Sequence, residues 1–235
     1  MGNKTVLITG VGKRIGLALA QHLLAEGYDV IGTYRTRYDS IEALKAAGAD
    51  LYCVDFYDDT QLSAFIATIQ ATYPSLRAIV HNASDWLPEG QATPAETLAK
   101  MMQIHVGVPY QINLALQALL TAHDGTADIV HLSDYVAEKG SKKHIAYAAS
   151  KAALNNLTLS FAAQLAPKVK VNAVAPAMIM FNPDDDEQYR AKTLKKSLME
   201  IEPGAQEVVE AITYLLNSQY VTGRVLPVDG GRHLK

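Results

Sequence analysis

The chain has 235 residues, of which 49% are hydrophobic and 19% charged, and its formal net charge is -3. This length suits one domain with a sizeable core, and the slightly acidic balance excludes a basic nucleic-acid-binding protein. Cys53 is the only cysteine, which excludes an internal disulfide and a cysteine-based metal cluster. We therefore expect a globular protein of the reducing cytoplasm with no metal site.

The N-terminus carries too short an apolar run for a signal peptide, since Val6-Leu7-Ile8 leads at once to Gly10. Val6 also breaks the myristoylation pattern, which requires Ser or Thr at that position. No segment approaches eighteen consecutive apolar residues, the length that indicates a membrane span. We expect neither a targeting segment nor a membrane anchor.

Apolar runs alternate along the chain with segments of helical periodicity. Helices are predicted at about 15–27, 41–47, 62–73, 101–120, 147–165 and 205–216, and short apolar strands at 6–8, 30–34, 51–54, 78–81, 129–132, 169–174 and 225–228. Buried strands that alternate with helices are typical of a parallel sheet covered on both faces. The sequence therefore predicts a single-domain, Rossmann-type, doubly wound α/β fold with seven strands.

One region departs from this alternation. Residues 178–199 contain the charged, helix-breaking run Asn182-Pro183-Asp184-Asp185-Asp186-Glu187, which is typical of an exposed segment. Ligands of doubly wound folds bind beyond the carboxyl ends of the strands, and this region follows the sixth predicted strand. It is either a lid that closes over a substrate or a solvated loop.

A glycine-rich turn, Thr9 to Gly16, connects the first predicted strand to the first helix. At such a turn, backbone N–H groups and the positive end of the helix dipole can meet a pyrophosphate, and glycine allows close approach of the ligand. The candidate cofactor-binding residues of this turn are Gly10, Lys13, Arg14, Ile15 and Gly16.

The residues at the end of the second predicted strand determine whether NADH or NADPH binds. A carboxylate there binds the ribose diol of NADH, whereas a cation there binds the 2'-phosphate of NADPH. Here the sequence is Arg35-Thr36-Arg37, with Lys13 and Arg14 in the adjacent turn. Four cations and no carboxylate are expected to meet, which favours NADPH. Asp55 is placed to reach an adenine edge, and Asn82-Ala83 the middle of the dinucleotide.

Tyr147 and Lys151 are four residues apart in a predicted helix, and therefore lie on one face. An ammonium about 4 Å from a phenol favours the phenolate by roughly 4 kcal/mol at an effective dielectric near 20, which lowers the phenol pKa by about three units. Tyr147 then becomes a usable general acid. Asp134 lies thirteen residues earlier.

These motifs together, with Val171-Asn172-Ala173 and Asp229-Gly230-Gly231, resemble the short-chain dehydrogenases/reductases over essentially the whole chain. The resemblance implies that Tyr147 is the catalytic acid and that Lys151 binds the nicotinamide ribose. It also implies that Pro176 to Met178 line the nicotinamide, and that the protein is a homo-oligomer, usually a homo-tetramer packed through its fourth and fifth helices.

Two departures resemble the pteridine reductases in particular: Arg14 stands where most of the superfamily has glycine, and Asp134 where most has serine. The resemblance implies that Trp86 covers a pterin ring. Ser84 and Arg14 are candidate partners for the pterin edge or the cofactor phosphates. Three further runs, 101–106, 143–151 and 229–234, resemble the bacterial members that reduce dihydromonapterin and, alternatively, dihydrofolate.

The function expected is NADPH-dependent reduction of a 7,8-dihydropterin or dihydrofolate. Hydride is added to C6 and a proton reaches N5 through Tyr147, Lys151 and Asp134. A carboxyl such as Asp134 can supply a proton to an imine nitrogen, whereas it would repel a carbonyl oxygen that gains negative charge. His105 occupies the place of the superfamily's relay asparagine, and imidazole can both donate and accept.

Two alternatives remain open at this stage. One is an NADPH-dependent carbonyl reductase of the same family, with which Asp134 conflicts. The other is a non-catalytic NADPH-binding sensor, although members that lose catalysis tend to lose the Tyr-Lys pair that this chain keeps.

Overall fold

The computed structural model describes residues 4–235. The prediction about the N-terminal targeting segment includes Met1 to Asn3, which lie outside the described residues. Within the described part, none of the helices combines the length and apolar character that a membrane span requires.

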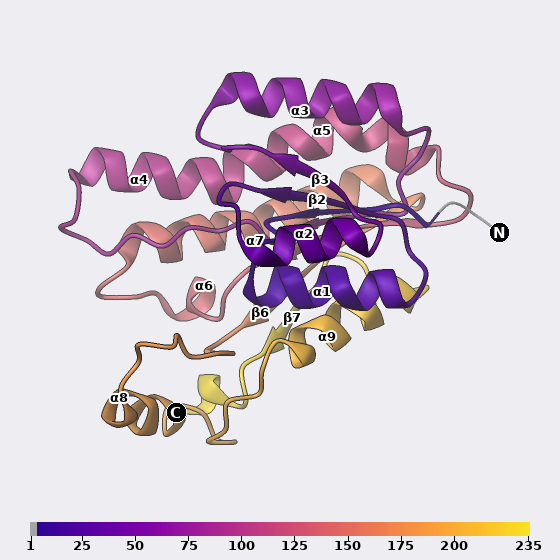
Figure 1. Cartoon of the computed structure of the whole chain (residues 1–235). Helices are drawn as coiled ribbons and strands as arrows, with labels where there is room; N and C mark the ends of the chain where they lie inside the picture. The colour runs from indigo at the N-terminus through magenta and orange to yellow at the C-terminus, as the bar shows by residue number, and fades with distance from the viewer. Residues whose placement is uncertain (1–3) are drawn as a thin grey trace.

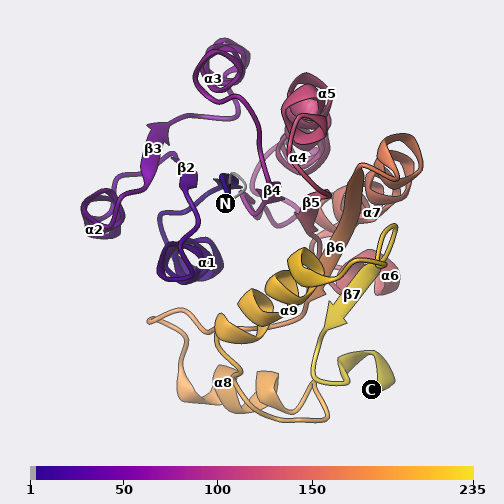
Figure 2. The same cartoon turned by 90° about the vertical axis from the view of Figure 1, so that its right-hand side faces the viewer.

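Seven parallel strands form one sheet in the order β3-β2-β1-β4-β5-β6-β7 (Figure 2). The predicted fold class is confirmed. The strands are β1 Val6–Thr9, β2 Val30–Tyr34, β3 Asp50–Cys53, β4 Ala78–His81, β5 Ala127–Leu132, β6 Val169–Pro176 and β7 Val225–Val228. The strand order reverses between β1 and β4, and a ligand crevice is expected at such a switch point.

Helices cover both faces of the sheet (Figures 1 and 2). One face carries α3 Asp59–Thr72, α4 Pro94–Met102, α5 Val108–Thr121 and α7 Ile145–Leu165, and the other carries α1 Arg14–Ala25, α2 Asp39–Ala46 and α9 Gln206–Asn217. Because both faces are covered, every residue of β1, β4, β5 and β6 is buried. This explains why β1 and β4 have continuous apolar runs, at 6–8 and 78–80, instead of alternating patterns.

The expected helix over 101–120 begins earlier and contains an irregular turn. A π-helical turn, Gln103–Gly107, joins α4 to α5. Pro109 lies four residues after His105 and has no N–H to give to its carbonyl, so the regular bonding pattern cannot continue there. The chain instead forms the wider bond from the Val108 N–H to the Gln103 carbonyl. Such single π-turns are frequent at functional sites.

The region 178–199 contains a helix that periodicity did not predict, α8 Glu187–Leu194. Figure 1 shows it apart from the layered body. The Asp186 carboxylate accepts from the Tyr189 N–H and caps its first turn. Two further short helices were also not predicted: α6 Val136–Lys139, and a 3-10 turn at Arg232–Leu234.

Candidate active site

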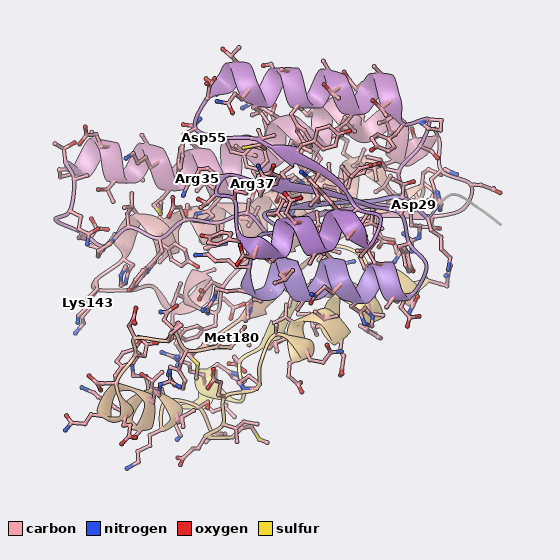
Figure 3. All side chains as sticks on the ribbon, viewed as in Figure 1. Asp29, Arg35, Arg37, Asp55, Lys143 and Met180 are labelled. Atoms are coloured by element: carbon pink, nitrogen blue, oxygen red, sulfur yellow. The ribbon has the colours of Figure 1, made fainter. Side chains whose placement is uncertain are left out.

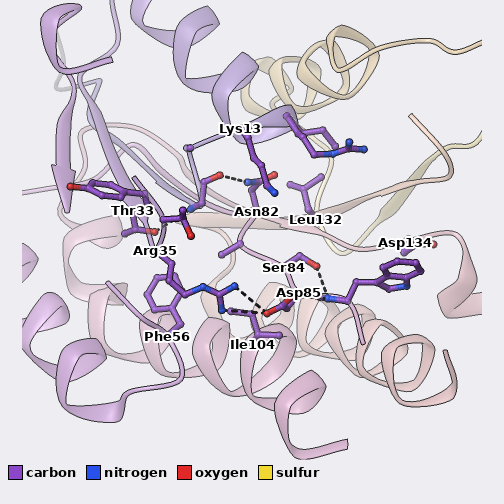
Figure 4. A pocket seen from close by; sticks show the side chains of 18 of the residues that line it. Lys13, Thr33, Arg35, Phe56, Asn82, Ser84, Asp85, Ile104, Leu132 and Asp134 are labelled. Carbon is purple, nitrogen blue, oxygen red and sulfur yellow. Dashed lines mark hydrogen bonds and ion pairs between the residues drawn. The ribbon is translucent and has the colours of Figure 1, made fainter. Parts of the chain in front are cut away.

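A cavity of about 660 Å³ opens where the carboxyl ends of the central strands meet. The β1–α1 turn and the segments that follow β2, β3, β4, β5 and β6 line it. Figure 4 shows Thr33 and Arg35 toward one end, and Ser84 and Asp134 toward the other. The cavity therefore joins the predicted cofactor end to the predicted chemical end.

The cavity brings together nearly all the candidate site residues. Those that line it are Gly10, Lys13, Arg14, Ile15, Arg35, Thr36, Asp55, Asn82, Ala83, Ser84, Trp86, Asp134, Tyr147, Lys151, Pro176 and Met178. Gly16 lies behind this lining: a Cβ there would come within 2.1 Å of the Gly10 carbonyl oxygen. Its contribution is to let α1 pack closely on the turn.

The turn before α1 has the geometry of an anion site. Gly10 has φ +78° and Arg14 φ +55°, so Arg14 occupies a left-handed position that favours glycine. This explains physically why glycine suits that position in other chains. Lys13 is the N-cap of α1, and its side chain makes no hydrogen bond to the helix. The N–H groups of the first turn therefore have no side-chain cap, and they lie at the positive end of the helix dipole, which is at the cavity.

Arg14 contacts the far wall of the cavity. Its guanidinium donates to the Met180 carbonyl at 2.9 Å and to Asn182 Oδ1 at 3.1 Å. The residue thus connects the glycine turn to the start of the 178–199 region. Met180 and Asn182, which also line the cavity, were not predicted as site residues because only the folded chain brings them to Arg14.

The expected meeting of four cations without a carboxylate is wrong in two respects. Arg35, Arg37 and Asp55 lie at the same end of the sheet (Figure 3), but Arg37 pairs with Glu42 at 2.5 Å and does not line the cavity. Arg35 does line it, and both of its terminal nitrogens lie 3.3 Å from Asp85 Oδ2 (Figure 4). Lys13, Arg14 and Arg35 are therefore the cavity's cations at this end.

Two predicted cofactor residues also hold the lining in place. The Asn82 amide donates to the carbonyls of Thr9 and Gly10 at 3.0 and 2.8 Å, which ties the end of β4 to the glycine turn. The Asp55 carboxylate accepts from the Tyr57 N–H at 3.0 Å. Tyr57, like Asp85, lines the cavity and was missed by sequence reasoning.

At the other end, Tyr147 and Asp134 face one another. The Tyr147 hydroxyl donates to Asp134 Oδ2 at 3.0 Å, and Asp134 Oδ1 accepts from the Val136 N–H. Burial raises the pKa of Asp134 above its ordinary value, against the opposing effects of Val136 and Lys151. Asp134 can therefore hold a proton more readily than an exposed aspartate.

The predicted lowering of the Tyr147 pKa is wrong. Burial, and then the charge and hydrogen bond of Asp134, raise its pKa well above the ordinary value. Sequence spacing does not reveal the desolvation of the phenolate, which has the largest effect on the Tyr147 pKa, while a hydrogen bond with Ser84 opposes it. Tyr147 is a neutral donor, and Asp134 is the more acidic member of the pair.

Lys151 lies beneath the tyrosine. Its Nζ is 5.6 Å from the centroid of the Tyr147 ring and donates to the Leu132 carbonyl at 2.7 Å. Burial lowers the Lys151 pKa to about 8, while the Asp134 charge opposes that shift. The ammonium is thus charged at neutral pH and near the point of losing its proton.

Trp86 is not a core residue. Its side chain lines the cavity, yet the residue is 61% exposed. The indole stacks on the His144 imidazole with ring centroids 4.6 Å apart. An exposed aromatic plane at the mouth of a cavity can cover a flat ligand.

The fold and this geometry define a class of protein, and comparison with known families agrees with it. A family model described as enoyl-(acyl carrier protein) reductase matches residues 10–233, and the chain belongs to this family of short-chain dehydrogenases/reductases.

Several curated relatives are called dihydromonapterin reductase. The chain is 56% identical over 239 residues to the one from an Enterobacter species, with 100% of both chains covered. It is 54% identical to the one from Klebsiella pneumoniae, with 99% of this chain and 98% of the relative covered.

Solved structures share the fold. An aldohexose dehydrogenase from Thermoplasma acidophilum superposes with a TM-score of 0.86 at 26% identity, covering 100% of this chain and 95% of that one. An alternative dihydrofolate reductase from Brucella canis, solved with NADP, gives 0.89 at 24% identity with the same coverage.

Proposed function

We propose that this protein uses NADPH to reduce the C=N bond of 7,8-dihydropterins and so forms tetrahydropterins. Dihydromonapterin is the proposed substrate, and dihydrofolate an additional one. The full-length relatives called dihydromonapterin reductase support this substrate class. The observation that carries the chemistry is the hydrogen bond between Tyr147 and Asp134 at the inner end of the cavity.

The residues at the end of the cavity that Thr33 and Arg35 line fit an NADPH molecule. Gly10 and the uncapped start of α1 provide an anion cradle for a pyrophosphate. Lys13 and Arg35 provide cations for a 2'-phosphate. Arg35 is 52% exposed in its ion pair with Asp85, and exposed pairs of this kind contribute little stability, so a phosphate can take the guanidinium over.

When bound, NADPH supplies the hydride that reaches C6 of the dihydropterin. The chain's residues provide the proton for N5. Burial raises the pKa of the Asp134 carboxylate, so it can take up and pass on a proton more readily than an exposed aspartate, and Tyr147 orients it through their hydrogen bond. Asp134 transfers the proton to N5, directly or through the Tyr147 hydroxyl. The Lys151 ammonium stabilises the carboxylate that remains.

Other residues hold the substrate in position. Trp86 covers the face of the pterin, and Ser84 binds its polar edge. The region 178–199 acts as a substrate loop, which Arg14 connects to the glycine turn through Met180 and Asn182. Such positioning converts the encounter of two ring systems into an effectively unimolecular reaction.

The family description favours a second reaction, reduction of an acyl or other carbonyl-containing substrate. In that reaction, negative charge develops on oxygen and requires a hydrogen-bond donor. Asp134 presents a carboxylate beside Tyr147 instead, which would repel such an oxygen. A C=N bond avoids this repulsion because its nitrogen gains a proton.

We further propose a cytoplasmic homo-tetramer. The exposed apolar side chains of Tyr110 on α5 and Leu159 on α7 support an interface on these helices. The single cysteine, Cys53, is a free thiol, which suits a reducing compartment. Light scattering of the purified protein tests the oligomeric state.

The experiment that tests the function is NADPH oxidation followed by absorbance, with dihydromonapterin, dihydrofolate and a panel of ketones and enoyl thioesters. Rapid oxidation with the dihydropterins alone is expected. Preference for a ketone or an enoyl thioester would overturn the proposal. Binding of NADPH without oxidation by any substrate would indicate a sensor.

A further inference from the structure

His105 lies within the π-helical turn and is buried, with 1% of its surface exposed. Its ring meets the Tyr147 ring edge-on, with centroids 5.2 Å apart and an interplanar angle of 87°. Each ring nitrogen contacts a serine: Nε2 lies 2.7 Å from Ser84 Oγ, and Nδ1 lies 2.8 Å from Ser150 Oγ. His105 therefore connects the cavity lining to helix α7.

The hydrogen-bond network assigns the imidazole proton to Nδ1. The Ser150 hydroxyl donates to the Tyr147 backbone carbonyl at 2.8 Å, and a hydroxyl has only one proton. Ser150 must therefore accept from His105, which requires a proton on Nδ1.

A neutral imidazole with its proton on Nδ1 has a bare Nε2. Burial and the nearby Lys151 charge lower the pKa of His105 to about 2, so the ring stays neutral at neutral pH. Nε2 then accepts the Ser84 proton over their 2.7 Å contact, which is shorter than the 3.4 Å from Ser84 Oγ to the Asp85 carbonyl. Ser84 lines the cavity. Because its one proton is donated to His105, its hydroxyl oxygen can only accept a hydrogen bond from a ligand.

We propose that His105 is a positioning residue, which fixes Ser84 as a hydrogen-bond acceptor and so selects a substrate that presents an N–H group rather than a carbonyl oxygen. This inference rests on the proposed function for the identity of the substrate, because a dihydropterin ring carries N–H donors along its edge. It assigns His105 a role other than proton relay. The imidazole acts through Ser84 and does not touch the reacting atoms.

Two amide substitutions of His105 distinguish the role of Nε2 from that of Nδ1. A glutamine amide can reach the place of Nε2 and accept from Ser84, whereas an asparagine amide reaches only the place of Nδ1. H105N should therefore raise the dihydropterin KM about tenfold, as expected for one lost hydrogen bond. It should leave kcat and the NADPH Kd within about threefold. H105Q should recover most of the KM.

The Ser84→Ala variant completes the test. S84A should also raise KM about tenfold, and H105N should add almost nothing in the S84A background, because both changes remove the same interaction. If the KM increases of S84A and H105N multiplied in the double variant, the proposal would be overturned. A wild-type KM in H105N would also overturn it, as would a better KM in H105N than in H105Q, which is the result a relay asparagine would give.

A measurement on the wild-type protein tests the proposal even if H105N does not fold. Nitrogen-15 NMR of labelled histidine should show His105 with a protonated Nδ1 and a bare Nε2 at neutral pH. The opposite tautomer, or a charged ring, would overturn the assignment. This result is independent of the substrate, so an inactive protein with this tautomer would contradict the proposed function and not the role of His105 toward Ser84.

Discussion

The Tyr147 hydroxyl donates to Asp134 Oδ2 at 3.0 Å, while Lys151 Nζ donates to the Leu132 carbonyl. A phenol, a carboxyl and an ammonium therefore share one buried end of the cavity. The phenol keeps its proton because burial and Asp134 raise its pKa. The carboxyl, whose pKa burial also raises, is the group best suited to give a proton to nitrogen.

Replacing Asp134 by Asn should remove that proton and preserve the shape of the side chain. Turnover of dihydropterin should fall about 10²- to 10³-fold, within the range of general acid catalysis. The measurement is kcat under saturating NADPH, with the NADPH Kd and the thermal midpoint as controls for folding. An Asp134→Asn enzyme with full turnover would show that the carboxyl is not the acid.

The pH dependence of NADPH binding should follow Lys151. Its pKa is lowered to about 8 by burial, and Asp134 raises it. The ammonium is therefore charged below pH 8 and is lost as the pH rises through that value. If Lys151 binds the nicotinamide ribose, NADPH affinity should decline from about pH 8 upward.

Asp134→Asn should move this decline to lower pH, because it removes the negative charge that favours the ammonium. Fluorescence titration of NADPH between about pH 6 and 10 measures the effect without turnover. Identical profiles for the two proteins, or a shift of the variant to higher pH, would contradict the coupling of Lys151 to Asp134.

The two arginines after β2 should differ in their effect on cofactor choice. Arg35→Ala should weaken NADPH by about 10- to 100-fold relative to NADH, since Arg35 lines the cavity and charge-assisted bonds contribute about 1.5–3 kcal/mol. Arg37→Ala is the matched control, because Arg37 pairs with Glu42 outside the cavity. Dissociation constants for both cofactors measure the difference. Equal losses with NADPH and NADH would remove the argument for a 2'-phosphate site.

Much of the fold could be predicted from local patterns. The apolar runs predicted β2 and β7 with their observed bounds, 30–34 and 225–228, because a short run of β-branched and apolar residues marks a strand without knowledge of its neighbours. The i,i+4 spacing of Tyr147 and Lys151 likewise predicted their shared face. These features depend on residues close together in the sequence.

The remaining features depend on the folded surroundings. Helix α8 buries only Thr193, so it has no apolar stripe from which periodicity could predict it. Arg35 meets Asp85 fifty residues away, a pairing that requires β2 and β4 to lie near one another across β1. The direction of the Tyr147 pKa shift was wrong because burial, which no spacing reveals, was left out.

The π-turn is an intermediate case. Pro109 is visible in the sequence, and its missing N–H predicts a break at the carbonyl four residues earlier. That carbonyl belongs to His105, so the break and the unusual histidine could have been connected. The contacts of the imidazole with Ser84 and Ser150 could not, since they join three separate segments.

The strongest effect on stability should come from a buried charge cluster at the amino end of the sheet. Asp128 is fully buried on β5 and pairs with Arg77 and with Lys170 Nζ, the latter at 2.7 Å. The same two cations donate to the carbonyls of Leu216 and Leu215 at the end of α9. The carboxylate therefore fixes two cations that hold a helix end against the sheet.

Asp128→Asn should lower the free energy of unfolding by about 3–5 kcal/mol, because it leaves the buried Lys170 and the partly buried Arg77 without their counter-ion. Glu42→Gln is the control: it removes the exposed pair with Arg37 and should leave the free energy of unfolding close to that of the unchanged protein. Urea unfolding at one fixed protein concentration measures both, since association would otherwise shift the midpoint. An Asp128→Asn protein as stable as the Glu42→Gln protein would show that the cluster contributes no net stability. The folded Asp128→Asn protein should keep its kcat, because Asp128 is the second residue of β5 and the cavity lies beyond that strand's other end at Leu132.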